Sequence, residues 1–262
     1  MIENLNQTPT IQTVFFDWNP LYKEDFRSLS EEEDILYQRE GDEPSRFSQF
    51  VSPESKIKIL FLRGNSLNDD DVKQITDGLK ENHTLKVLDI SYNKITGQSI
   101  EYFKELTELN KTLEFIGLAK NNLSIEDLQG LLDCIGKTPF PEEEADAHIK
   151  KMKERDAIIE KNKKLKASKK PEEPVPLIDD IEQQEDGSWV MVKNGQLRHI
   201  NMCMNPITDD SKNLILDLLK RTPNEFSITL SGTQMTKEVV QEIHGELNTD
   251  DMPDLGRQRL LF

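Results

Sequence analysis

The chain has 262 residues, which is enough for one long domain or two small ones. Its 49 acidic and 33 basic residues give a formal net charge of −16, and such a surface cannot replace the counterions of a nucleic acid. The chain has two cysteines, which lack metal-ligand spacing, and it shows no signal-peptide core and no long apolar run. We therefore expect a soluble cytoplasmic protein with no membrane partner.

An eleven-residue pattern, L-x-x-L-x-L-x-x-N-x-L, first begins at Ile11, after a polar lead-in of residues 1–10. Two apolar residues follow at helical spacing, Phe26 and Leu29. An acidic segment over about residues 30–47 then delays the next copy, and a solvated loop is the simpler interpretation of such a like-charge run. Residues 11–56 are therefore predicted to be a first repeat with an acidic insert.

Three further copies begin at Ile57, Leu85 and Leu113, at a fixed period of 28 residues. The apolar positions of each copy predict a short strand, and the asparagine amide suits the turn that follows because it both donates and accepts hydrogen bonds. Apolar residues three and four apart then predict an amphipathic helix. Self-similarity at this period predicts a leucine-rich repeat solenoid, an α/β fold with three regular repeats over residues 57–138. A 28-residue period with a full helix resembles the ribonuclease-inhibitor type of leucine-rich repeat.

Residues 139–196 interrupt the period and are predicted to be an insertion. Its first part is helix-forming and basic, with at most a thin apolar stripe, so it cannot bury much of itself against the repeats. A proline-rich linker follows, and then Asn194-Gly195 between two β-rich runs predicts a hairpin. The candidate protein-binding residues of the basic helix are Lys150, Lys151, Lys153, Arg155, Lys161, Lys163 and Lys164.

The pattern returns at Leu197, and residues 197–249 are predicted to hold two C-terminal repeats. In the last repeat Thr233 replaces the asparagine, as expected of a decayed terminal repeat. The tail, residues 250–262, ends in apolar side chains. These side chains either cap the array or dock against another surface, or the tail is disordered. The prediction is about six repeats in all.

No catalytic constellation is recognisable. The four histidines are scattered, and no nucleophile elbow, P-loop or paired-carboxylate motif is present. The acidic run lacks the residue order of a tight calcium loop. Cys134 and Cys203 lie inside repeats and are expected to be small core residues. We therefore expect a protein that is not an enzyme and that needs no cofactor and no metal.

The surface most open to interpretation is the concave sheet. In L-x-x-L-x-L the third and fifth residues point away from the core, because side chains alternate along a strand. In the first four repeats these positions are largely apolar: Phe15, Ile59, Phe61, Val87 and Phe115. We call these five residues the stripe. An exposed apolar stripe marks a contact surface, although the protein's own insert or N-terminus is an alternative cover.

These features predict a non-enzymatic scaffold for protein–protein interaction. The repeat class and the charged insertion are similar to those of leucine-rich-repeat proteins of motile-cilium axonemes. That resemblance implies a cytoskeletal or axonemal location and several protein partners, with the basic helix meeting tubulin or another acidic surface. The alternative is a regulator of a GTPase or another enzyme bound on the concave face, because the repeat type also resembles ribonuclease inhibitor and the GTPase-activating protein of Ran. The apolar concave face and the absence of a long acidic C-terminal tail depart from those two families.

Overall fold

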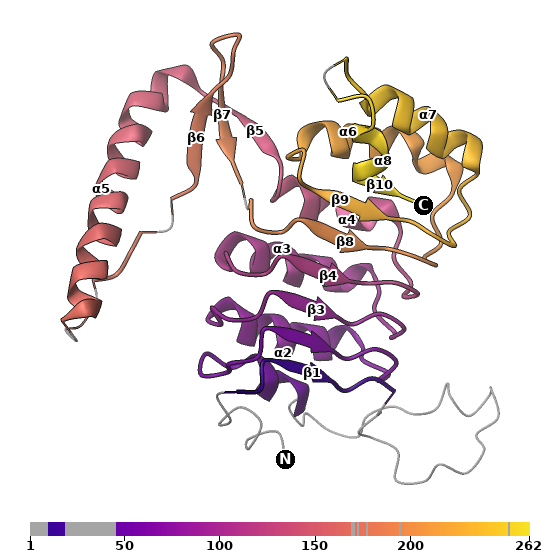
Figure 1. The fold of residues 1–262 in the computed structure, drawn as a ribbon, viewed down its shortest axis with the longest axis horizontal. Helices are drawn as coiled ribbons and strands as arrows, with labels where there is room; N and C mark the ends of the chain where they lie inside the picture. Colours follow the sequence, from indigo (N-terminus) through magenta and orange to yellow (C-terminus); the bar gives the residue numbers. More distant parts are fainter. Residues whose placement is uncertain are drawn as a thin grey trace.

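The computed structural model describes residues 10–18, 46–168, 171, 173–176, 178–193, 195–250 and 252–262. Its main feature is a seven-stranded sheet in which every neighbouring pair is parallel. In spatial order the strands are β1 (Thr13–Phe15), β2 (Ile59–Phe61), β3 (Val87–Asp89), β4 (Phe115–Gly117), β8 (His199–Asn201), β9 (Ser227–Thr229) and β10 (Leu260–Leu261). The mixed α/β class and the parallel sheet agree with the prediction. Figure 1 shows the strands stacked from the N-terminal end to the C-terminal end.

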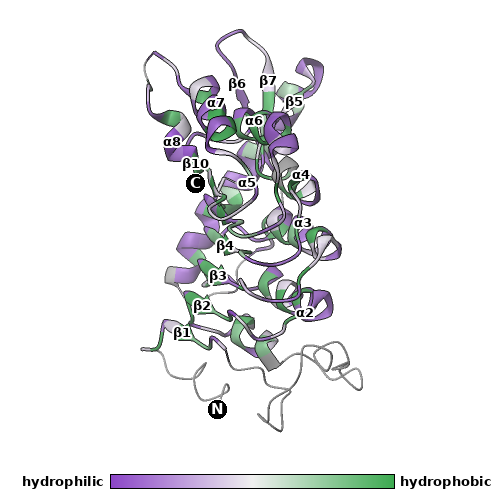
Figure 2. Ribbon diagram, turned by 90° about the vertical axis from the view of Figure 1, so that its right-hand side faces the viewer, coloured by the Kyte–Doolittle hydropathy of each residue, from purple (hydrophilic) through white to green (hydrophobic). Residues whose placement is uncertain are grey.

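Amphipathic helices connect the strands and stack along one side of the sheet (Figure 2). They are α2 (Asp69–Lys80), α3 (Ile100–Leu109), α4 (Ile125–Asp133), α6 (Lys212–Arg221) and α7 (Lys237–Leu247), with the 3₁₀ turns η2 (Arg46–Val51), η3 (Gly97–Ser99) and η4 (Asp209–Ser211). The short helix α8 (Leu255–Arg259) lies at the C-terminal end, against α7 and next to β10. Asn68 and Asp71 form a reciprocal capping box that fixes the start of α2. We call this sheet and its helices the body.

One core runs through the body. The central residue of each strand points toward the helices, and parallel pairing aligns Leu60, Leu88 and Ile116, all fully buried. A slip of one residue would turn each of these side chains to the opposite face, so burial fixes the register. Each fully buried aliphatic side chain contributes roughly 1.5–3 kcal/mol to folding.

The turn after the strand of each unit holds a left-handed residue directly before the asparagine position. Positive φ angles recur there at Trp18 (57°), Gly64 (66°), Tyr92 (59°), Lys120 (47°), Met204 (58°) and Gly232 (72°). Only two of these six residues are glycine, although a side chain in this conformation costs on the order of 1 kcal/mol. The turn geometry is therefore a property of the repeat that the residues must adopt.

An asparagine ladder then joins neighbouring units. The Asn93 carboxamide oxygen accepts hydrogen bonds from the backbone N–H groups of Asn65 (2.9 Å) and Leu67 (3.0 Å), and its Nδ2 donates to the carbonyls of Leu62 and Ile90. Asn121 and Asn205 repeat the arrangement one unit further on each time. The ladder ends at Thr233, whose buried hydroxyl oxygen has no hydrogen-bond partner among the described residues.

The insertion forms a separate unit, which we call the arm, over residues 137–193. It contains β5 (Lys137–Phe140), α5 (Glu142–Ala167), β6 (Asp180–Gln183) and β7 (Trp189–Val192). The three strands form an antiparallel sheet in the order β5-β7-β6. The arm leaves the body between α4 and β8, and α5 stands away from the seven-stranded sheet (Figure 1).

The hairpin predicted across Asn194-Gly195 is wrong. β7 pairs with β5 and β6, whereas β8 pairs with β4 and β9 in the other sheet. The hairpin turn of the arm instead lies between β6 and β7, where Gly187 has a φ of 87°. Asn194 lies outside the described residues, but its place in the sequence explains the error. It precedes Leu197 by three residues, as Asn82 and Asn110 precede Leu85 and Leu113, so it belongs to the repeat pattern.

The two ends of the body are closed differently. At the N-terminal end, η2 packs against α2 with Phe47 and Phe50 fully buried, while the predicted helical positions Phe26 and Leu29, like most of the acidic insert, lie outside the described residues. At the C-terminal end the tail caps the sheet, since β10 pairs with β9 and Leu260 is buried. None of the described helices is both long and apolar enough to cross a membrane.

Candidate protein-binding surfaces

The register of the sheet arranges the stripe in two rows on the face opposite the helices. Ile59, Val87 and Phe115 are directly paired in adjacent strands, and Phe15 is paired with Phe61 in the second row. The structure therefore brings all five predicted residues together on one face.

Exposure is uneven along the stripe. Phe15 is 66% exposed, whereas the other four side chains are half-buried by their neighbours. The rings of Phe15 and Phe61 stack with centroids 4.7 Å apart, and the guanidinium of Arg63 lies 5.1 Å from the centroid of the Phe61 ring. The N-terminal end of the stripe is thus a stacked aromatic pair with a cation beside it.

A charged pair fixes the edge of this aromatic end. The Asp17 carboxylate accepts from Arg63 Nε (2.9 Å), Nη2 (2.6 Å) and the Arg63 backbone N–H (2.9 Å). The hydrogen bond with Asp17 is the main cause that raises the pKa of Arg63 above its ordinary value. Asp89 is buried in the same row, and its Oδ2 lies 3.9 Å from Arg63 Nε. The Asp89 carboxylate also lies over Gly117, where any side chain would collide with it. The row therefore changes from apolar to polar between β2 and β4.

The stripe ends in a polar cluster at β8 and β9. The Phe115 ring stacks on His199 at 5.2 Å, and the imidazole contacts Ser227 Oγ (2.7 Å) and Thr229 Oγ1 (3.0 Å) through its two nitrogens. Burial lowers the pKa of His199, so the ring is neutral at pH 7. This half of the face is suited to hydrogen bonding, and the other half to apolar contact.

The sequence analysis missed a second exposed apolar group. Trp18, Tyr92 and Met204, with Lys120, occupy the left-handed position at the carboxyl ends of four strands, and we call these four residues the ridge. The rings of Trp18 and Tyr92 meet at 5.5 Å, the Tyr92 hydroxyl donates to Met204 Sδ at 3.4 Å, and Lys120 Nζ lies 5.4 Å from the centroid of the Tyr92 ring. The available signal was a large side chain directly before the asparagine of a repeat.

The predicted basic helix is α5, and polar side chains attach the returning chain to one of its faces. His148 Nε2 contacts the Asp179 carbonyl oxygen at 2.8 Å, Arg155 Nη1 donates to the Ile178 carbonyl at 2.7 Å, and Asn162 bonds to both backbone groups of Glu173 at 2.8 Å. These three residues are seven apart, which is two helical turns, so they share a face. The returning segment therefore lies along α5.

The opposite face of α5 is a row of lysines. Lys150, Lys153, Lys161 and Lys164 are spaced by three, eight and three residues, and all are exposed. Lys161 pairs with Glu173, but Lys150, Lys153 and Lys164 form no ion pair with any described residue. Lys151 and Lys163 are also exposed, and Lys163 pairs with Glu160.

Arg155, predicted to contact a partner, does not belong to this row. It is half-buried on the other face of α5 and pairs with Asp180 at 2.7 Å. Hydrogen bonding to Asp156 is the first cause that raises its pKa. Arg155 therefore holds the arm together, and the outward charge comes from the lysines.

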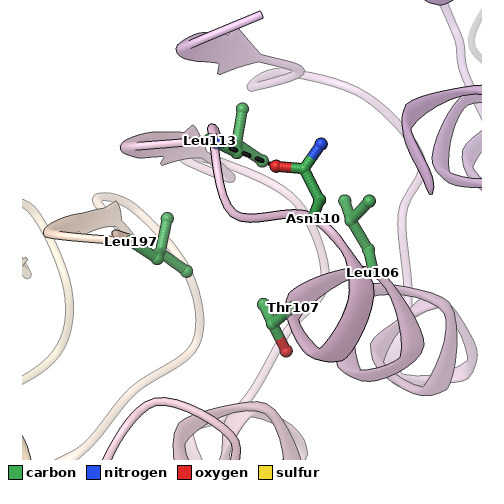
Figure 3. A pocket seen from close by; sticks show the side chains of 5 residues that line it. All are labelled: Leu106, Thr107, Asn110, Leu113 and Leu197. Atoms are coloured by element: carbon green, nitrogen blue, oxygen red, sulfur yellow. Dashed lines mark hydrogen bonds between the residues drawn. The ribbon is translucent and has the colours of Figure 1, made fainter. Parts of the chain in front are cut away.

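A shallow notch marks the place where the arm leaves the body. It is lined by Leu106, Thr107, Asn110, Leu113 and Leu197 (Figure 3) and leaves essentially no space for a water molecule. Leu113 and Leu197 open two successive units, and 84 residues separate them where a regular repeat would place 28. The insertion thus separates two lining residues of the notch in the sequence, and the lining offers little chemistry.

The described residues hold no group of metal-ligating side chains. Burial raises the pKa of the Cys134 thiol, which therefore stays protonated at neutral pH. Cys203 is half-buried in the turn after β8. Protein contact is the chemistry that these surfaces support best.

Comparison with known proteins adds a family match within the body. Residues 84–106 match the Leucine Rich Repeat family model. NACHT, LRR and PYD domains-containing protein 4B of Mus musculus is 30% identical over 76 residues, which are 29% of this chain and 9% of the relative. NACHT, LRR and PYD domains-containing protein 13 of Homo sapiens is 26% identical over 86 residues, 33% of this chain and 8% of the relative. The matches thus span less than a tenth of the length of these relatives.

Two solved structures align with this chain at low identity. Leiomodin-1 actin-binding site 2 aligns over 77% of this chain and 88% of that chain, with a TM-score of 0.46 and 10% identity. An internalin from Listeria monocytogenes aligns over 73% of this chain and 32% of that chain, with a TM-score of 0.34 and 14% identity. The family match and the two relatives, with the recurring strand and asparagine turn, support a leucine-rich repeat protein, and such repeats suggest protein–protein interaction.

Proposed function

We propose that this chain is a six-repeat solenoid of the ribonuclease-inhibitor type that acts as a non-enzymatic scaffold in a large assembly. The observation that carries the proposal is the stripe, which lies on the sheet face opposite the helices and ends in the exposed Phe15. The arm supports it, because its described strands form a sheet of their own and α5 stands away from the seven-stranded sheet (Figure 1). Cover by the acidic insert stays an alternative, since most of that insert lies outside the described residues.

The test is quantitative affinity purification with the stripe altered. The double variant Phe15→Asp, Phe61→Asp places two carboxylates where an apolar partner would pack. We expect the recovery of stoichiometric partners to fall at least tenfold. Leu109→Asp is the matched control, because Leu109 is a 38% exposed apolar residue at the end of α3 on the helical side. Equal partner recovery from both variants would remove the stripe from the interface.

The second part of the proposal is that the lysine row of α5 meets an acidic protein surface such as tubulin. Three of its ammonium groups have no ion pair with the described residues, whereas the whole chain carries a net charge of −16. A local cationic row on an acidic protein selects partners by charge complementarity. Co-sedimentation with microtubules tests this proposal. The triple variant Lys150→Glu, Lys153→Glu, Lys164→Glu should no longer pellet with microtubules. Higher salt should reduce the amount of wild-type protein in the pellet. Unchanged pelleting of the triple variant contradicts the proposal.

Location is part of the same proposal: a cytoplasmic protein held in the cytoskeleton, with the ciliary axoneme as the leading site. Retention of the chain in a salt-washed cytoskeletal fraction at a fixed ratio to other subunits supports a structural role. Recovery as a free monomer that accelerates GTP hydrolysis by a purified GTPase would favour the regulator instead.

A further inference from the structure

The ridge is the least expected surface of the molecule. Its four residues occupy a backbone position where φ is positive in every unit, and where Gly64 and Gly232 meet the requirement without strain. Trp18, Tyr92, Lys120 and Met204 adopt the same conformation at a conformational cost. Strained side chains of this kind concentrate where function requires the side chain itself.

Packing within the body does not account for these side chains. Trp18 is 62% exposed and Met204 is 50% exposed, so each leaves half of its surface or more in water. Gly64 leaves room for the Trp18 ring, because any side chain at Gly64 would collide with it. The ring thus reaches Tyr92, and the three side chains form one continuous surface across the units of β1 to β8.

The ridge also carries a charge that specifies its ligand. The Lys120 ammonium faces the Tyr92 ring and forms no ion pair with any described residue, and Lys94, two residues after Tyr92, is likewise exposed without one. Tryptophan and tyrosine are the side chains that most often dominate protein interfaces. A cation beside an aromatic and thioether surface favours an apolar side chain with a carboxylate next to it.

We propose that the ridge binds a segment of another protein that packs a bulky apolar side chain against Tyr92, between Trp18 and Met204, and places a carboxylate at Lys120. The inference rests on the proposed protein-binding function and adds a second contact surface and the chemistry of its ligand. The overall acidity of the chain makes a nucleic acid the wrong ligand for this surface.

The test is a selection of random twelve-residue peptides displayed on phage against the full-length chain, followed by anisotropy titration of the enriched synthetic peptides. We expect an apolar residue beside Asp or Glu in the enriched peptides. Trp18→Gly and Met204→Gly should each weaken binding at least tenfold, while Tm stays within about 3 °C of the wild type because glycine suits the backbone. Lys120→Glu should weaken binding, and Lys120→Arg should preserve it.

Phe115→Asp separates this inference from the proposed function. Peptides that still bind Phe115→Asp but lose binding to the glycine variants support the ridge, whatever the stripe does. Peptides that lose binding only to Phe115→Asp would support the stripe and overturn the ridge. No enrichment, peptides without an acidic residue, or unchanged binding to Trp18→Gly and Met204→Gly would also overturn it.

Discussion

The body and the arm are stabilised in different ways. In the body, strand after strand buries its central side chain completely, as at Leu60 and Leu88. In the described part of the arm only Ala145, Asn162 and Ile181 are buried, and all four residues of β7 are half-buried. In the arm, hydrogen bonds and an ion pair join α5 to the returning chain.

The difference shows how a repeat array accepts a long insertion. Each described strand of the body pairs only with the strands beside it, and β4 pairs directly with β8 although the arm lies between them in the sequence. The register Phe115 to His199 continues the register Val87 to Phe115 without a shift. The arm is therefore added to the body at a turn and does not replace any part of its core.

The largest expected effect separates the two regions by burial. Leu88→Ala removes a fully buried side chain from β3 and should lower the free energy of unfolding by about 3 kcal/mol. Met191→Ala in β7 removes a half-buried side chain and should cost about 1 kcal/mol. Urea denaturation followed by circular dichroism measures both, and equal losses would contradict the contrast between body and arm.

The asparagine ladder gives the next largest effect. Asn93→Ala leaves the N–H groups of Asn65 and Leu67 without their acceptor, so the free energy of unfolding should fall by roughly 2 kcal/mol. The same change at the exposed Asn213 of α6 is the control and should alter stability by less than about 0.5 kcal/mol. If the two variants unfold at the same urea concentration, the ladder does not hold the units together.

At the decayed end of the ladder a substitution should stabilise the body. Thr233 has a buried hydroxyl oxygen without a partner among the described residues, and an asparagine there can bridge to the preceding unit as Asn205 does. Thr233→Asn should raise the free energy of unfolding by about 1 kcal/mol. A lower Tm in calorimetry would show that the last unit does not share the turn geometry of the others.

The smallest effect at neutral pH concerns His199. Burial lowers its pKa in the folded state, so below the ordinary pKa of about 6.5 the unfolded chain binds a proton that the folded chain does not. Stability is therefore complete above about pH 6.5 and declines as the pH falls toward the folded-state pKa, by at most about 1.4 kcal/mol per pH unit. Urea titrations between pH 5 and 8 should show a shallower decline in His199→Gln, and identical slopes would contradict this account.

Much of the body could be predicted from the sequence, because its determinants are local and periodic. The leucine spacing predicted the strand centres at Leu60, Leu88 and Ile116 and the direction of the stripe. The arm lacks such a period, and Asn194-Gly195 suggested a hairpin because its place three residues before Leu197 was not recognised as part of the repeat. Arg155 was assigned to the outer surface because sequence alone does not show which face of α5 the returning chain covers.

The ridge was missed for a different reason. The residue directly before the asparagine of each repeat was interpreted only as part of a turn. The sequence does not show that its φ angle is positive. The left-handed conformation of Trp18, Tyr92 and Met204, and the contacts that follow from it, emerge only when the units are stacked.

Native-state hydrogen exchange tests the contrast between the two regions most directly. Amides of β2, β3 and β4 should exchange only through global unfolding, with a free energy that falls steeply as denaturant is added. Amides of β5, β6 and β7 should exchange through local opening, at a free energy lower by about 2 kcal/mol or more and nearly independent of low denaturant. Arm amides that exchange at the same free energy and denaturant slope as β3 would contradict the account, because arm and body would then unfold as one unit.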